Sequence, residues 1–186
     1  AATYPEQTGW STTRCSVGSV PNVALGPNGR FLRSEVWQGL CISIPGRGET
    51  NALGLPSEVP RPTGTATYRL TSPERDMLDC IPMQSGLPGE GFRLTTASGV
   101  RYSFDVGTVR TDAPLETWFA GFGSGDTPLM YQYLLKRNRY FLLASKIEDR
   151  FGNTVEYQYN ASGHPVRIWS NDGREINLTY VSGRLE

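Results

Sequence analysis

The chain has 186 residues, and its 18 basic and 18 acidic side chains give a formal net charge of zero. A neutral chain lacks the basic excess with which proteins neutralise nucleic-acid phosphates, so we expect no nucleic-acid partner. No stretch approaches the roughly 20 apolar residues that a membrane-spanning helix needs. The 21 glycines and 13 prolines favour turns over helices, so we expect an all-β protein of short antiparallel strands and hairpins.

We expect residues 1–64 to form a loop-rich N-terminal β segment. The turn signal within Gly26–Gly29 predicts a hairpin over Val20–Leu32. A strand is expected over Trp37–Ile44, ending at Pro45–Gly48. The prolines between Gly48 and Gly64 remove backbone donors and oppose regular strand, so this stretch is expected to be a loop or a link between two layers.

The cysteines are Cys15, Cys41 and Cys80, an odd set without the CxxC spacing of a zinc site. In an oxidising compartment any one of three pairings could form. A bond between Cys15 and Cys41 would tie down the glycine-rich N-terminal segment and leave Cys80 as a thiol. The alternative is three reduced thiols acting as small apolar side chains.

Residues 65–140 are expected to form a β-sheet region. Thr65–Thr71 alternates like a strand, and Met77–Met83 is its expected partner. Phe92–Leu94 and Tyr102–Phe104 are expected to pair as a hairpin around Ala97–Gly99.

The stretch Ala113–Pro128 interleaves glycines with Trp118, Phe119 and Phe122. It lacks the strand-turn-helix setting and the lysine of a phosphate-binding loop, so we expect a flexible excursion. Because aromatic side chains are hard to bury in such a loop, these three are the candidate contacts for a ligand or partner. The basic run Lys136–Arg139 could hold phosphates, but a solvated strand or turn explains it more simply.

Residues 141–186 contain a short sequence motif that occurs in about two copies. Apolar residues alternate with polar ones in each copy, which predicts strands with one buried face. Glycine and asparagine between these strands favour tight turns, so each copy is expected to be a β-hairpin. The corresponding positions are Ile147, Gly152, Val155, Tyr157 and Tyr159 in the first copy, and Ile168, Gly173, Ile176, Leu178 and Tyr180 in the second.

The full pattern combines an isoleucine, an aspartate, a glycine turn, an aromatic pair and a closing Gly-Arg-Leu. Its residues are Ile147, Asp149, Gly152, Asn153, Tyr157, Tyr159, Gly163, Ile168, Asp172, Gly173, Arg174, Tyr180, Gly183, Arg184 and Leu185. This pattern resembles the Rhs or YD-repeat proteins of bacteria over Leu142–Glu186, and more loosely over Gly89–Asp105. It departs from the family at Asn160 and Val181, which stand where an aspartate usually follows the tyrosine.

In that family, tandem repeats wind into a large closed β-shell of secreted or surface-delivered proteins, which often enclose a C-terminal toxin. The resemblance implies that this chain is the start of such a shell, preceded by a loop-rich β segment. Its expected location is secreted or at the cell envelope, and its expected partners are further repeats, an enclosed toxin domain and delivery machinery. The alternative is a carbohydrate- or cell-surface-binding module, in which exposed tryptophans would contact a glycan.

The sequence offers few residues in patterns typical of catalytic or metal-binding sites. The one histidine, His164, precedes Pro165 in a turn and is expected to face solvent rather than act as a general base. Neighbouring acids such as Glu148 and Asp149 point to opposite faces of a strand, and acids such as Asp76 are expected to keep turns soluble. The Asn171–Gly173 turn needs its residues for backbone reasons without calcium. We therefore expect no enzyme, no cofactor and no metal site.

Overall fold

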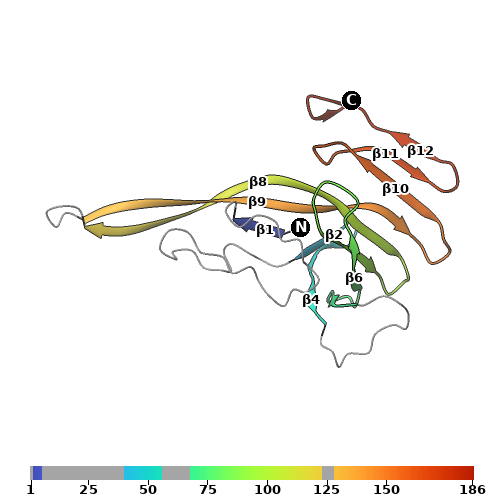
Figure 1. Ribbon diagram of the computed structural model, residues 1–186, viewed down its shortest axis with the longest axis horizontal. Coiled ribbons are helices and arrows are strands. Elements are labelled where there is room, and N and C mark those ends of the chain that lie inside the picture. The colour runs from blue at the N-terminus through green and yellow to red at the C-terminus, as the bar shows by residue number, and fades with distance from the viewer. Residues whose placement is uncertain (1, 6–39, 56–67, 123–127) are drawn as a thin grey trace.

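The computed structural model describes residues 2–5, 40–55, 68–122 and 128–186 (Figure 1). The described residues contain strands and no helix, so the prediction of an all-β protein of antiparallel strands is confirmed. The hairpin predicted over Val20–Leu32 lies outside the described residues, as does Cys15.

A ten-stranded sheet dominates the molecule. Its strands follow the chain as an antiparallel meander, so each strand pairs with its sequence neighbours, and the N-terminal strand adds to one side of the ninth. The strands are β1 (Ala2–Pro5), β4 (Leu53–Gly54), β5 (Leu70–Thr71), β6 (Met77–Pro82), β7 (Glu90–Thr95), β8 (Arg101–Phe122), β9 (Pro128–Glu148), β10 (Thr154–Tyr159), β11 (Pro165–Ser170) and β12 (Glu175–Asn177). Two small hairpins accompany it: β2 (Cys41–Ile44) with β3 (Gly48–Asn51), and β13 (Tyr180–Val181) with β14 (Arg184–Leu185).

Two predicted pairings in the middle of the chain are confirmed. β5 pairs with β6 through Leu70 opposite Leu78. β7 pairs with β8 through Phe92 opposite Phe104 and Leu94 opposite Tyr102. Both hairpins join neighbouring segments of alternating sequence, which is the arrangement that local patterning predicts best.

β8 and β9 are 22 and 21 residues long, far longer than the other strands. They extend beyond the sheet as a two-stranded arm (Figure 1). The flexible excursion expected over Ala113–Pro128 is therefore wrong as far as Phe122: the register shifts between Asp112 and Leu115, and pairing then continues to Phe122 opposite Pro128. Aromatic and β-branched side chains favour this strand in spite of its glycines.

The two faces of the sheet differ in chemistry. On one face, Leu78, Leu94 and Tyr102 lie opposite one another across neighbouring strands. On the other face, opposite charges are paired across strands: Arg93 Nη2 lies 2.6 Å from Asp79 Oδ2, and the same distance separates Arg101 Nη2 from Glu148 Oε1. The period of two along each strand produces this separation.

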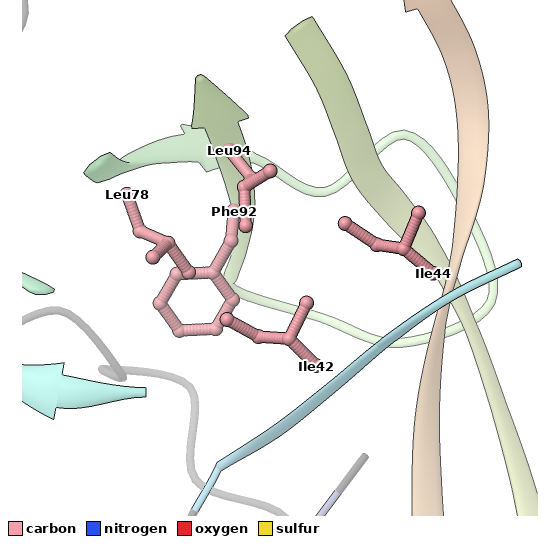
Figure 2. Packing of buried hydrophobic residues seen from close by; sticks show 5 residues of the cluster. All are labelled: Ile42, Ile44, Leu78, Phe92 and Leu94. Atoms are coloured by element: carbon pink, nitrogen blue, oxygen red, sulfur yellow. The ribbon is translucent and has the colours of Figure 1, made fainter. Parts of the chain in front are cut away.

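The main hydrophobic core lies between the apolar face and the β2–β3 hairpin. Ile42 and Ile44 of β2 meet Leu78, Phe92 and Leu94 of β6 and β7 (Figure 2), and the Leu94 side chain is 0% exposed. Burial of these side chains holds the hairpin against the sheet.

An ion pair also ties the hairpin to the sheet. Arg47, in the β2–β3 turn, places Nη2 2.8 Å from Oδ2 of Asp76, which is 2% exposed and also accepts a bond from Ser72 Oγ at 3.2 Å. Asp79 is likewise buried and paired with Arg93. The expectation that such acids merely keep turns soluble is therefore wrong, because both are structural.

Both copies of the repeat form the expected hairpin about their glycine turns, with Ile147 of β9 opposite Val155 of β10 and Ile168 of β11 opposite Ile176 of β12. β10 and β11 then join the two copies through the turn at Asn160–Gly163. In the second copy, β12 ends at Asn177 after pairing with β11, and a separate hairpin of β13 and β14 closes through Ser182 and Gly183. Leu178 N still donates to Val166 O at 2.9 Å, so the chain follows β11 beyond the end of β12.

Candidate functional site

A cavity of about 460 Å³ lies where the β2–β3 hairpin crosses the apolar face of the sheet. Its size falls within the range of small-molecule sites, about 300–1,000 Å³. The described lining residues are mostly aliphatic and aromatic: Leu40, Cys41, Ile42, Ser43, Ile44, Pro45, Glu49, Leu78, Phe92, Tyr102, Phe104, Arg139, Phe141, Leu142, Leu143, Ala144, Ile147, Tyr157 and Tyr159. Segments distant in sequence therefore form one apolar chamber.

The tyrosines of the first repeat line this chamber. Tyr157 and Tyr159 stack with ring centroids 6.4 Å apart, and the Tyr159 hydroxyl donates to Ala144 O at 2.7 Å. Burial raises the pKa of Tyr159 to about 12, and electrostatic interactions with Tyr157 and with the Asp105 carboxylate add to this effect. Both tyrosines therefore stay neutral at physiological pH.

Cys41 and Glu49 form a polar part of the lining. The Cys41 thiol donates to Asn51 Oδ1 at 3.2 Å. Burial raises the pKa of this thiol, and so do a hydrogen bond to Glu49 and the charge of its carboxylate. A thiol with a raised pKa is a weak nucleophile at neutral pH, which argues against a reactive cysteine here.

The cationic part of the lining is Arg139, which lies directly opposite Arg110 in the β8–β9 register. The guanidinium carbon of each lies 5.2 Å from the centroid of the Phe141 ring. Neither arginine forms an ion pair with a residue in the described part of the chain, whereas Arg137 on the same strand pairs with Asp112 at 3.9 Å. The basic run predicted as a strand does lie in β9, but Arg139 contributes to the chamber.

A second buried polar group lies beside the chamber, at a bulge between β8 and β9. Asp105 occurs where the register shifts between Phe104 and Val106, and Oδ1 of its carboxylate is buried without a hydrogen-bond partner among the described residues. Burial raises the pKa of Asp105, and a hydrogen bond from Ser145 partly opposes that change.

The polar residues of the repeat form hydrogen bonds within their own turns. They do not converge on a shared binding site in the described residues. Asp149 Oδ1 accepts from the backbone N–H groups of Phe151 at 2.8 Å and Asn153 at 2.9 Å, and its Oδ2 accepts from Asn153 Nδ2 at 2.7 Å. Asp172 accepts in the same way from Arg174, at N and at Nε. These bonds lower the pKa of both carboxyls.

Asn171 connects the two copies, and the sequence reasoning missed this role. Its Oδ1 accepts from Thr154 N and its Nδ2 donates to Gly152 O, both at 3.1 Å. The second turn is thereby fastened to the first. Its place in the second turn was visible in the sequence, but the spatial contact between turns was not.

The predicted aromatic contact site lies on the arm, apart from the chamber. Trp118 is 54% exposed, and the side chains of Phe119 and Phe122 lie outside the described part of the structure. Trp118 shares a face with Met130 and Leu134, which are also exposed, and with Gln132, whose amide donates to Glu116. The arm therefore presents a stripe of exposed apolar side chains. No hydrogen bond in the described residues links this stripe to the chamber.

The possible disulfide between Cys15 and Cys41 does not form, because Cys41 is a thiol. Cys80, which was expected to remain a thiol under that pairing, is disulfide-bonded. In β6 it lies opposite Phe92, and it packs against the main core. The cysteine spacing alone could not distinguish these arrangements, because pairing depends on which strands the fold brings together.

The remaining predicted positions are explained by local packing. His164 stacks on Tyr180 with ring centroids 5.1 Å apart. No group of three or more His, Cys, Asp or Glu side chains suited to a metal ion occurs in the described residues. The described part of the chain also has no helix of the length and apolarity needed to cross a membrane.

Comparison with known proteins finds no matching family model, no matching curated protein and no matching solved structure. The fold and the site therefore define this chain at the level of class: an all-β protein whose meandering sheet carries a hairpin repeat near its C-terminus.

Proposed function

We propose that this chain is a non-catalytic structural segment of a secreted or surface-delivered Rhs/YD-repeat protein. In this proposal it forms part of a β-shell that encapsulates or delivers a C-terminal toxin. The observation that carries the proposal is that the repeat hairpin extends the large sheet strand by strand, from β9 through β10 and β11 to β12. Each added copy would therefore lengthen one continuous wall.

The end of the sheet supports further growth. In the described residues, β12 pairs with β11 along one side, and the neighbouring β13–β14 hairpin forms a sheet of its own. Ile176 on β12 is 58% exposed, and Leu185 on β14 is 60% exposed. Exposed apolar side chains on an edge strand favour pairing with another strand, which the next repeat would supply.

The chemistry of the two faces also suits a wall. Ion pairs such as Arg167 with Glu175, at 2.7 Å, cover one face and keep it compatible with water. The other face carries the apolar chamber and the core. An antiparallel sheet with one wet and one covered face can enclose a volume without a catalytic site.

Hydrogen–deuterium exchange tests this proposal at the β12 edge. The isolated 186-residue chain and the native product from its source cells would be compared for exchange at the amides of Glu175 and Asn177, which alternate with those that face β11. Protection of these amides in the native product and rapid exchange in the isolated chain would support a sheet that continues. Equal, rapid exchange in both would overturn the proposal.

A carbohydrate- or surface-binding module is the second candidate, because Trp118 is exposed beside the hydrogen-bonded pair Glu116 and Gln132. An aromatic face flanked by polar groups can stack on a sugar ring. Tryptophan fluorescence would be titrated with cell-wall glycans in the native chain and in Trp118→Ala. Trp169→Phe serves as the matched control, since Arg167 already covers its ring at 4.9 Å. A glycan response lost in Trp118→Ala alone supports this function, and no response from the native chain removes it.

A further inference from the structure

The chamber under the β2–β3 hairpin combines a long apolar lining with one cationic residue, Arg139, and Arg110 lies directly opposite Arg139 on β8, beside the described lining. Phe141, Leu142 and Leu143 of β9 are lining residues, as is Arg139 on the same strand. A chamber of this composition suits a ligand with a hydrocarbon body, because transfer of hydrocarbon from water is favourable in proportion to the area covered.

The arginines indicate the charge of such a ligand. Arg110 and Arg139 occupy directly opposite positions on β8 and β9, where like charges destabilise a sheet. Both are held over the Phe141 ring, and neither is neutralised by a carboxylate in the described part of the chain. A bound anion would relieve the repulsion between them. Guanidinium groups hold carboxylates with paired, charge-assisted hydrogen bonds.

We propose that the chamber binds a fatty-acid-like carboxylate, with its hydrocarbon chain against the apolar wall and its carboxylate at Arg110 and Arg139. Glu49 is the one acidic residue in the described lining, and its carboxylate forms a hydrogen bond with the Cys41 thiol. Its charge favours a ligand with a single anionic head over a ligand with two. This inference does not depend on the repeat-shell proposal, since a chamber of this kind could operate in a wall or in a separate module.

Isothermal titration calorimetry with sodium dodecanoate, below its micelle concentration, tests the inference on the full chain. We expect one saturable site in the native chain. In the double variant Arg110→Gln/Arg139→Gln the dissociation constant rises by about tenfold or more, because the charge-assisted hydrogen bonds are lost. Binding of the uncharged analogue dodecanol changes little in the same variant, since its hydrocarbon contacts remain.

Two further variants separate this effect from general damage. Arg184→Gln removes one arginine charge on β14, which contributes no residue to the described lining of the chamber, and leaves dodecanoate affinity unchanged. Ala144→Phe adds a ring inside the chamber and reduces the affinity for both dodecanoate and dodecanol. Circular dichroism checks that each variant keeps its strand content.

Three results would overturn the inference. The first is no dodecanoate binding to the native chain, and the second is equal affinity in the native chain and the double arginine variant. The third is a short apolar peptide with a free C-terminal carboxylate that binds more tightly than dodecanoate and competes with it. That result would assign the chamber to a chain terminus in place of a fatty acid.

Discussion

Single polar residues in the repeat act through turns. Asp149 accepts three hydrogen bonds within its own turn, and Asn171 fastens the next turn to it. Such side chains offer the backbone local partners where no sheet bond is available. The polar residues of the repeat therefore have a structural role in this chain.

The Asp149 turn gives a prediction about pH. Because hydrogen bonds from Asn153 hold the pKa of Asp149 below its ordinary value of 3.8, its carboxylate stabilises the fold above that value. This contribution is lost as pH falls through the lowered folded-state pKa. We expect Asp149→Ala to lower the melting temperature at pH 7 and the difference to shrink below about pH 4.

Melting curves of the native chain, Asp149→Ala and Asp149→Asn between pH 7 and 2 measure this effect. Asp149→Asn keeps one oxygen acceptor for the backbone and loses the charge, so its melting temperature should lie between the other two at pH 7. A difference between native chain and Asp149→Ala that stays constant down to pH 2 would contradict the assignment.

Gly163 gives a second residue-scale prediction. Its φ of +76° disfavours other residues, and an added Cβ would lie 2.9 Å from Thr108 Cγ2 on β8. We expect Gly163→Ala to destabilise the fold by about 1–3 kcal/mol, from backbone strain together with the clash. Gly152→Ala is the matched control, because its φ is +87° and its Cβ would meet open space.

Urea unfolding of both variants compares these costs. The cost for Gly163 should exceed that for Gly152, and Thr108→Ala should recover part of the difference. Equal costs at the two glycines would show that the β10–β11 turn does not pack on β8.

At the scale of elements, the β2–β3 hairpin is held to the sheet by a buried core and by one buried carboxylate. Leu94→Ala should cost about 2–5 kcal/mol, because the side chain is fully buried among residues of β2 and β6. Leu134→Ala on the arm should cost under about 0.5 kcal/mol, because its side chain is 56% exposed. Urea unfolding of the two variants makes the comparison, and similar costs would contradict the position of the core.

Asp76 is the carboxylate that fastens this hairpin. Asp76→Ala should destabilise the fold by about 1–3 kcal/mol, because Arg47 and Ser72 lose their acceptor. Arg101→Gln, which breaks the more exposed pair with Glu148, should cost about 0–1 kcal/mol. Hydrogen–deuterium exchange at Cys41–Ile44 should rise in Asp76→Ala alone, and unchanged exchange there would contradict the clamp.

The sequence predicted the conformation of some elements and not of others. The β10–β11 hairpin was predictable, since its alternation and its turn residues are local. The arm was not, because glycines around Trp118 suggested a loop while strand pairing with β9 fixed the actual conformation. The second copy forms its hairpin as β11 and β12, but Tyr180, which was expected on the same strand as Ile176, pairs instead in the separate β13–β14 hairpin.

At the scale of the whole molecule, the chamber was beyond sequence reasoning. It requires the β2–β3 hairpin to pack on strands far along the chain, and it requires the β8–β9 register that places Arg110 opposite Arg139. The β8–β9 register shifts at three points, and no local sequence signal specifies all of them. Long-range packing, and not periodicity, decides which residues meet there.

In the described residues, the large sheet carries the β8–β9 arm at one side and ends at β12 of the repeat region at the other (Figure 1). The central claim is that this sheet is one part of a larger β-shell. An antibody raised against the chain, applied to envelope, cytosolic and secreted fractions of its source cells, tests that claim most directly. The account predicts a secreted or envelope-associated band several times larger than 20.5 kDa. A cytosolic band of the chain's own size would contradict it.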